Sequence, residues 1–288
     1  MLKKQYLYVI LPALLVVGII VVGLLTGEDF ALLNSKGLIA ASERNLALIA
    51  IGIMLVVVIP IFILEFLVSK KFSEHNKKAV YDPNWNRSKL LVFVWWTVPT
   101  VVVLILGINN WNATHKLDPF RAIESDKRPL KIQVISLQWK WLFIYPEQNI
   151  ATVNYLVFPE KTPINFELTS DAPMNSFWIP SLGGQVYAMT GMGTKLHLIA
   201  DKTGEFRGSA AEISGRGFSG MRFMAKSVSD QEFSNWVMTI KKSQNRLDLD
   251  QYEKLAIPSE NTPPLYYSST EPDLYNKVMQ KYMSPMHH

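Results

Sequence analysis

Residues 137–147 read LQWKWLFIYPE, and large apolar side chains recur at every second position from Leu137 through Trp139 and Trp141 to Phe143 and Tyr145. Successive side chains of a β-strand point to opposite faces, so this period of two predicts a strand with one face in a core. In this interpretation Trp139 and Trp141 are packing residues.

Working outward, residues 164–168 (INFEL) and 195–198 (KLHL) show the same alternation, which places His197 on the solvent face of its strand. Proline and glycine separate these runs, as at Pro146, Pro159 and Gly183–Gly184. Short alternating strands with regular breakers are typical of a sandwich or barrel. We therefore expect an antiparallel β-sandwich over residues 113–228.

Upstream of the sandwich lie three apolar runs without charge, at 6–25, 46–64 and 90–108. Each is about as long as a helix that crosses the hydrocarbon core of a bilayer, roughly 28–30 Å. The last two predict a transmembrane hairpin over 29–112. The first, within 1–28, fits either an uncleaved anchor helix or a signal peptide, and both alternatives stay open.

The charges flanking these runs predict an orientation. The loop 69–89 and the N-terminus are rich in basic residues, at Lys3, Lys4, Lys70, Lys71, Lys77, Lys78, Arg87 and Lys89. Positive loops stay in the cytoplasm. We therefore expect a multi-pass membrane protein with its N-terminus in the cytoplasm and its sandwich on the periplasmic or extracellular side.

Composition excludes several classes of function. The chain has no cysteine, which excludes disulfides, thiolate metal sites and thiol catalysis. The net charge is +5, but no run of Lys and Arg is longer than two residues. We therefore predict no nucleic-acid partner, and the topology accounts for the basic residues instead.

After Ser229 the pattern becomes helical and rich in tyrosine and tryptophan. We expect helices over 231–242, 248–255 and 271–283, within a C-terminal extension at 229–288. Prolines at 258, 263 and 264 interrupt it.

Four stretches in order resemble subunit II of the haem–copper terminal oxidases. VWWTVP at 94–99 is similar to the family's Trp-Thr-x-x-Pro entry to its last membrane helix, and 137–147 to its aromatic strand. MNSFWIPSLGGQVYAMTGM at 174–192 and AAEISGRGFSGM at 210–221 resemble the two copper-bearing loops. The resemblance implies a cupredoxin-like fold for the sandwich.

In copper-bearing members the last loop reads Cys-x-Glu-x-Cys-x-x-x-His-x-x-Met. The resemblance implies that Ala210 and Ser214 stand in place of the two cysteines, Phe218 in place of the loop histidine, and Asn175 in place of the upstream histidine. Alanine and phenylalanine have no donor atom, and serine and asparagine are hard, weak ligands for copper.

Two positions of the pattern remain, Glu212, which in the family ligates through its carbonyl, and Met221. A lone thioether and a peptide carbonyl do not hold a copper pair, so we expect no metal and no other cofactor in this chain. An electron-entry subunit of a cytochrome c oxidase is the alternative that this loss disfavours, and a free-standing receptor does not explain the order of the motifs.

The copper-less pattern resembles the quinol oxidases, above all the cytochrome bo type. It implies a non-redox subunit II of a proton-pumping respiratory quinol oxidase in a bacterial inner membrane, which supports assembly and the outer face of the large subunit. The expected partners are subunit I with its haems and one copper, subunits III and IV, membrane lipids and the substrate quinol.

One position departs from the family. A glutamate usually precedes Trp-Thr at the cytoplasmic entrance of a proton pathway, but SKLLVFVWWT at 88–97 has no acid, and Val92 or Phe93 stands there. Glu65 lies at the cytoplasmic end of the preceding run. An acid in a membrane segment is a functional candidate, so Glu65 is our candidate for proton entry; pairing with Lys70 or Lys71 is the alternative.

Overall fold

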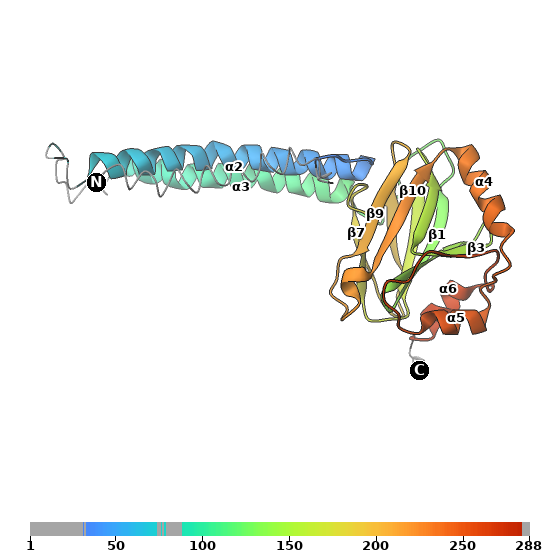
Figure 1. The fold of residues 1–288 in the computed structure, drawn as a ribbon. Helices are drawn as coiled ribbons and strands as arrows, with labels where there is room; N and C mark the ends of the chain where they lie inside the picture. The colour runs from blue at the N-terminus through green and yellow to red at the C-terminus, as the bar shows by residue number, and fades with distance from the viewer. Residues whose placement is uncertain (1–30, 32, 74–75, 77, 79–87, 284–288) are drawn as a thin grey trace, which may run out of the picture. The chain divides into compact units, whose positions relative to one another are not determined.

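The computed structural model describes residues 31, 33–73, 76, 78 and 88–283. The predicted anchor or signal segment at 1–28 lies outside these residues, as does much of the loop 69–89. From Ser35 on, the chain forms one compact unit (Figure 1).

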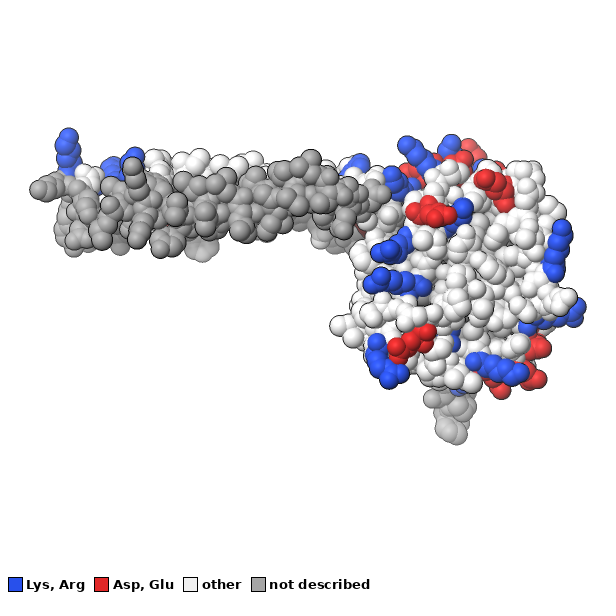
Figure 2. Space-filling view, viewed as in Figure 1, with Lys and Arg blue, Asp and Glu red and all other residues white. Residues whose placement is uncertain are grey.

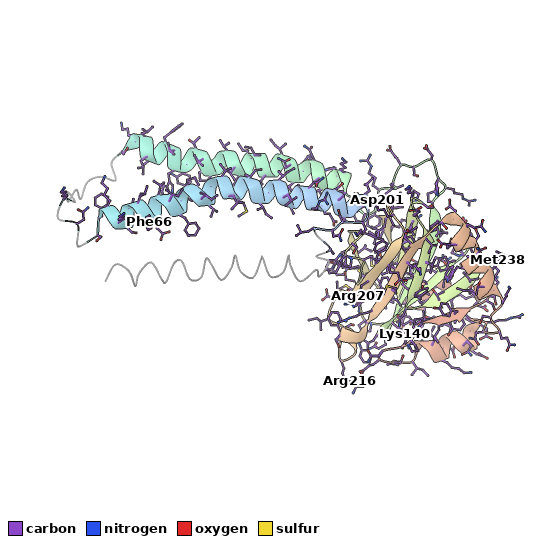
Figure 3. All side chains as sticks on the ribbon, turned by 45° about the horizontal axis from the view of Figure 1, so that its top comes forward. Phe66, Lys140, Asp201, Arg207, Arg216 and Met238 are labelled. Carbon is purple, nitrogen blue, oxygen red and sulfur yellow. The ribbon has the colours of Figure 1, made fainter. Side chains whose placement is uncertain are left out.

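Two long apolar helices form the N-terminal part of this unit, α2 (Leu38–Lys71) and α3 (Lys89–Lys116). Both are long and apolar enough to cross a membrane. Each contains a proline, Pro60 and Pro99. Their side chains project from the helices along their whole length (Figure 3). In Figure 2 the visible charged side chains lie over the sandwich and at the two ends of the helices.

Two β-sheets form the sandwich. The six-stranded sheet has the order β11-β3-β2-β1-β5-β8, and the five-stranded sheet has the order β4-β10-β9-β6-β7. The strands of the first are β1 (Leu130–Leu137), β2 (Lys140–Tyr145), β3 (Ile150–Val153), β5 (Ile164–Ser170), β8 (Thr194–Leu198) and β11 (Leu265–Tyr267). Those of the second are β4 (Tyr155–Pro159), β6 (Asn175–Trp178), β7 (Gln185–Ala188), β9 (Gly204–Ala210) and β10 (Arg222–Val228).

The sandwich is confirmed, but its sheets are mixed. Strand β1 pairs with β5 in parallel, and β10 pairs with β4 in parallel, while the remaining pairings are antiparallel. Parallel neighbours need a crossover connection, and here the chain passes to the other sheet before returning. Local alternation carries no information on strand direction, so the sequence did not predict these pairs.

The stretch 137–145 is two strands and a turn, which corrects the prediction of a single strand. Gln138 and Trp139 form the turn between β1 and β2, and Leu137 pairs with Lys140. Trp139 has a φ of 64°, a left-handed conformation that suits a two-residue hairpin turn. The turn places Trp139 at the edge of the core that holds Trp141, where it is half-buried and packs against that core.

Every residue of β2 is buried because both faces of its sheet are covered. Trp141, Phe143 and Tyr145 pack into the core between the two sheets. Leu142 and Ile144 pack on the opposite face into a second core, which the C-terminal extension completes. This second layer explains why the apolar residues of 141–145 are continuous rather than alternating.

The C-terminal extension contains α4 (Asp230–Lys241), α5 (Leu249–Ala256), β11 and α6 (Leu274–Gln280). The three helices lie where the sequence predicts them, and the last is shorter than predicted. The strand β11, which was not predicted, pairs with β3 through Tyr267 and Ala151. Ser229 and Glu232 form a capping box at the start of α4.

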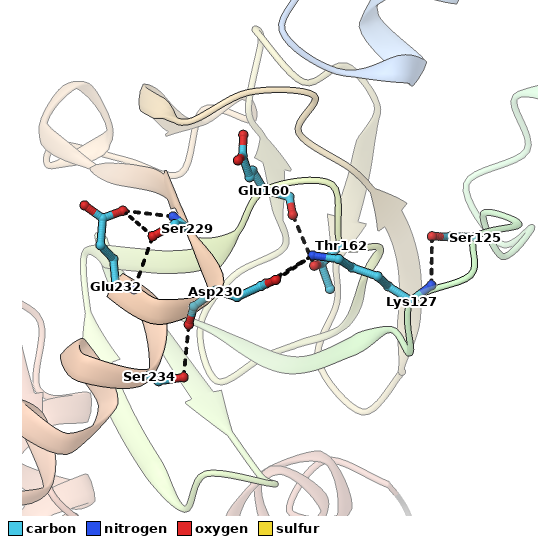
Figure 4. Close-up of polar contacts among 8 residues, drawn as sticks. All are labelled: Ser125, Lys127, Glu160, Thr162, Ser229, Asp230, Glu232 and Ser234. Atoms are coloured by element: carbon cyan, nitrogen blue, oxygen red, sulfur yellow. Dashed lines mark hydrogen bonds and ion pairs between the residues drawn. The ribbon is translucent and has the colours of Figure 1, made fainter.

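Polar contacts hold the start of α4 to the segment that leads from α3 into the sandwich (Figure 4). The Lys127 Nζ lies 2.8 Å from the Asp230 carboxylate. The Thr162 hydroxyl donates to the Glu160 carbonyl at 3.2 Å. The Lys127–Asp230 pair therefore ties the first residue of α4 to the segment that precedes β1.

The first turn of α2 is hydrogen-bonded to the sandwich. The Ala40 amide donates to the Leu182 carbonyl at 3.1 Å, and the Gly184 amide donates to the Glu43 carboxylate at 3.1 Å. Gly183 has a φ of 84°, and a Cβ there would lie 2.5 Å from the Ala40 nitrogen. Glycine is therefore required at this close approach of the two backbones.

Candidate functional site

The site predicted from the sequence lies where three strands of the five-stranded sheet meet. The loop 211–221 connects β9 to β10, and the Ala210 amide closes its base by donating to the Met221 carbonyl at 3.0 Å. Strand β6 lies beside β9, and the Ala211 amide donates to the Ser176 carbonyl at 2.9 Å. This arrangement brings Asn175, at the start of β6, next to the loop.

Asn175 forms the centre of a neutral polar cluster. Its Nδ2 donates to the Ser214 hydroxyl at 2.9 Å and lies 3.3 Å from the Met221 sulfur. Its Oδ1 accepts from the Ser176 amide at 2.8 Å. Asn175 and Met221 are each only 1% exposed, and a buried amide is stable only when it has such partners.

The other predicted site residues lie around this cluster, two of them apolar and one partly exposed to solvent. Ala210 is buried, and Phe218 packs against the main core from a short 3-10 helix, η2 (Phe218–Gly220). Glu212 lies in the loop and is partly exposed. The fold therefore brings Asn175, Ser214 and Met221 into contact and leaves the Glu212 carboxylate outside that contact.

Trp139 packs against the loop from the hairpin turn of the other sheet. Its indole Nε1 donates to the Ser214 carbonyl at 3.1 Å. A Cβ on Gly217 would lie 2.4 Å from the indole ring, so only glycine leaves room for it. Trp139 is half-buried and confirms the packing role predicted from its sequence.

These residues do not fit a copper pair. The methyl group of Ala210 and the ring of Phe218 offer no electron pair for a soft metal. The Asn175 amide and the Ser214 hydroxyl are already bonded to each other. Among the residues that the structure describes, no three His, Cys, Asp or Glu side chains are grouped as metal ligands would be.

Glu65 lies on α2, one turn before Lys70 and Lys71, and its side chain is exposed in the single chain. Val92 and Phe93 lie near the start of α3 and are also exposed. None of the ion pairs found within the described part of the chain joins Glu65 to Lys70 or Lys71.

His197 is buried, which corrects the prediction of a solvated side chain. It is 9% exposed, and its Nδ1 lies 3.0 Å from the Pro119 carbonyl. The segment that follows α3 covers this face of β8 and supplies the partner. Strand alternation predicts which residues share a face but not whether a distant segment covers it.

Sequence reasoning also missed two buried charged residues, Lys140 and Asp171. The Lys140 side chain is among the buried ones, and the Asp171 side chain is 2% exposed. Burial lowers the pKa of Lys140 because it disfavours the charged form. The position of Lys140 between Trp139 and Trp141, in an otherwise apolar stretch, was the feature of the sequence that could have indicated its burial.

Comparison with known proteins identifies relatives over most of the chain. Residues 148–228 match the family model of the periplasmic domain of cytochrome c oxidase subunit II, and residues 241–286 match the COX aromatic-rich motif. The second match covers most of the extension predicted from its tyrosines and tryptophans.

Three curated relatives are similar over most of their length. Cytochrome bo(3) ubiquinol oxidase subunit 2 of Pseudomonas putida is 49% identical over 97% of this chain and 88% of its own. The protein of the same name from Pseudomonas aeruginosa is 49% identical over 90% and 78%. Ubiquinol oxidase subunit 2 of Acetobacter aceti is 43% identical over 91% and 86%.

Proposed function

The chain belongs to the quinol oxidase subunit 2 family, and we propose that within such a terminal oxidase it acts without a redox centre of its own. The observation that supports this proposal is the mutual contact of Asn175, Ser214 and Met221, three neutral side chains at positions that the sequence resemblance assigns to the family's copper site. Electrons then have no relay through this chain.

The oxidation of quinol therefore belongs to a partner. We expect the haems and one copper in subunit I, where a lipid-soluble donor reaches them from the membrane. Subunits III and IV and membrane lipids complete the expected surroundings. The role of this chain is to support assembly and to shape the outer face of subunit I. The exposed apolar side chains of α2 and α3 offer the surface for lipids and partner subunits.

Metal analysis and optical spectroscopy of the purified complex test this proposal. We expect one copper per complex, no near-infrared band of a dinuclear copper centre, and oxidation of quinol but not of cytochrome c. Two further copper atoms per complex, or rapid oxidation of cytochrome c, would show an electron-entry subunit instead.

A four-fold variant is the positive control for the spectroscopy. It combines Asn175→His, Ala210→Cys, Ser214→Cys and Phe218→His, and so returns soft donors to a loop of unchanged length. A near-infrared band in this variant and none in the native chain would assign the absence of copper to these four side chains.

We also propose that Glu65 supplies the carboxylate that is missing from the start of α3. Helices α2 and α3 are joined by a basic loop, so Glu65 and Val92 lie toward the same end of the hairpin. A carboxylate at the cytoplasmic entrance would deliver protons to the large subunit. The basic loop also supports an orientation with the N-terminus in the cytoplasm and the sandwich outside.

A further inference from the structure

The segment 257–262, with the sequence IPSENT, crosses from the end of α5 toward β11 and contacts both the hairpin turn at 138–140 and the loop 211–221. We call these six residues the strap. It belongs to the C-terminal extension, more than a hundred residues from the turn it contacts. Lys140 and Arg216, which the strap contacts, are labelled at the same end of the sandwich in Figure 3.

The inner contact of the strap is made by Lys140. Its Nζ donates to the Ile257 carbonyl at 2.8 Å and to the Ser259 hydroxyl at 2.6 Å. Lys140 is only 2% exposed, so these hydrogen bonds form away from water. A buried lysine requires such partners, since leaving them unmade costs more than a typical hydrogen bond contributes.

A second inner contact joins the strap to the end of β3. The Asn154 Nδ2 donates to the Thr262 carbonyl at 2.8 Å, while its Oδ1 accepts from the Trp141 amide at 2.9 Å. Within the strap, the Ser259 and Thr262 hydroxyls lie 2.7 Å apart. These bonds fix the strap at both ends over the β1–β2 hairpin.

The outer side of the strap meets the loop 211–221. The Glu260 carboxylate lies 2.6 Å from the Arg216 Nε. Asn261 lies so close to Gly220 that a Cβ there would come within 2.3 Å of its side-chain oxygen. The exposed ion pair alone contributes little, but the close approach of the Asn261 side chain to Gly220 and the buried Lys140 anchor place the strap directly on the loop.

The loop is therefore held from two sides. Asn175 and Trp139 bond Ser214 from within, and the strap contacts Arg216 and Gly220 from outside. In a metal-bearing site the metal ties such a loop to the neighbouring strand, and loop order depends on it. We propose that the strap replaces the metal as the element that holds this loop in one conformation.

The proposal rests on the proposed function in one respect, namely that the loop binds no metal. Hydrogen exchange of the purified oxidase complex, with this chain resolved by peptide mass, tests it. Lys140→Met removes the ammonium group that bonds the strap and keeps an apolar side chain of similar length. Amides of the strap and of residues 211–221 should both exchange about tenfold faster or more, because hydrogen bonds to a charged donor are lost. Amides in the centre of β10 should not change.

Lys226→Met is the matched control. Lys226 is also a strand lysine of the sandwich, and its Nζ bonds the Glu205 carboxylate instead of the strap. It should leave exchange in the strap and the loop unchanged. Faster exchange of the strap with an unchanged loop in Lys140→Met would overturn the proposal, as would no change in either segment.

A second variant covers the case in which Lys140→Met fails to assemble. The double variant Ser259→Ala with Glu260→Gln alters the strap alone and leaves Lys140 and the loop intact. Loop amides that stay at the native rate while the strap amides accelerate would again overturn the proposal. Copper content is measured on the same samples, so failure of the metal-free assignment appears as extra copper and is distinguished from failure of the strap.

Discussion

The side chain of Asn175 links strand β6 to the loop 211–221 through hydrogen bonds alone. It contacts Ser214, Met221 and the Ser176 amide at once. Each polar atom is paired, so the buried cluster costs little and the loop keeps its shape. The site is thus closed by hydrogen bonds that need no ion.

Gly217 gives a prediction at the same scale. Gly217→Ala would place a methyl group 2.4 Å from the indole of Trp139, and such overpacking costs about 1–3 kcal/mol of unfolding free energy. Denaturation of the purified full-length chain, followed by tryptophan fluorescence, measures this loss.

Gly204→Ala is the control for that measurement, because its Cβ would meet the Phe206 ring at an ordinary 3.5 Å. The two variants should differ in unfolding free energy by the cost of the clash. Equal stability of both would show that Trp139 does not pack on Gly217 in solution.

Glu65 gives a functional prediction. In Glu65→Gln we expect severalfold slower quinol oxidation and proton uptake with unchanged haem content, because the amide does not carry a proton inward. Partial recovery in Glu65→Gln with Val92→Glu would support a relocated carboxylate. Native turnover in Glu65→Gln would contradict the proton-entry role and leave Glu65 as a residue of the membrane interface.

At the scale of elements, one buried carboxylate joins two helical segments of the C-terminal extension to the sandwich, beside the β11–β3 pairing and the shared apolar core. The Asp171 side chain accepts from the Tyr252 hydroxyl at 2.6 Å, from the Lys281 Nζ at 2.9 Å and from the Tyr282 hydroxyl. Tyr252 lies on α5, and Lys281 and Tyr282 follow α6. Asp171 therefore links α5 and the end of α6 to the β5–β6 loop.

The contacts of Asp171 with Tyr252, Lys281 and Tyr282, which we call the Asp171 joint, predict that the extension loses its packing on the sandwich at alkaline pH. Burial, with the hydrogen bond to Asp171, raises the pKa of Tyr252 above its ordinary value of 10.0. The hydrogen bond to Asp171 raises the pKa of Lys281 above 10.5 and that of Tyr282 above 10.0. Groups with raised folded pKa values stabilise fully below their ordinary values, and the stabilisation is lost as the pH rises through the raised values.

Tyrosinate absorbance and near-ultraviolet circular dichroism against pH measure this transition. We expect tyrosine ionisation to coincide with loss of the extension's packing at a pH above 10.0. In Asp171→Asn the Lys281 pair is lost, so the transition should move to lower pH. Ionisation of Tyr252 and Tyr282 at their ordinary pKa in the intact fold would contradict their hydrogen bonds to Asp171.

At the scale of the whole molecule, backbone hydrogen bonds join the start of helix α2 to the sandwich. The Lys36 amide donates to the Ser181 carbonyl at 2.8 Å, and the Asp201 amide donates to the Lys36 carbonyl at 2.9 Å. Helix α2 thus begins on the sandwich itself, and both helix ends near the sandwich must lie on the same side of the membrane as the sandwich.

Cysteine labelling in spheroplasts tests the orientation. Lys195 is exposed on β8, and the cysteine of the variant Lys195→Cys should react with an impermeant thiol reagent. The cysteine of Lys77→Cys should react only after the membrane is opened. The native chain has no cysteine, so only the introduced cysteine can react with the reagent. The opposite pattern of labelling would reverse the topology.

The sequence by itself predicted the two long apolar helices and the sandwich, which the structure confirms, and an absence of copper donors, which stays a prediction. Each of these depends on residue type or on spacing within a few positions. Twenty apolar residues, a period of two, or an alanine at a ligand position need no knowledge of distant segments. For the same reason the helices of the extension were predicted from their own residues.

Only the tertiary structure decided which residues these elements bury and what they pair with. Lys140 meets Ile257 across 117 positions, and Asp171 meets Lys281 across 110. The parallel pairs and the burial of His197 likewise depend on segments far away in the chain. Periodicity is a local property, whereas burial of a charged or polar group depends on whatever covers it, so these features appear only when the chain has folded.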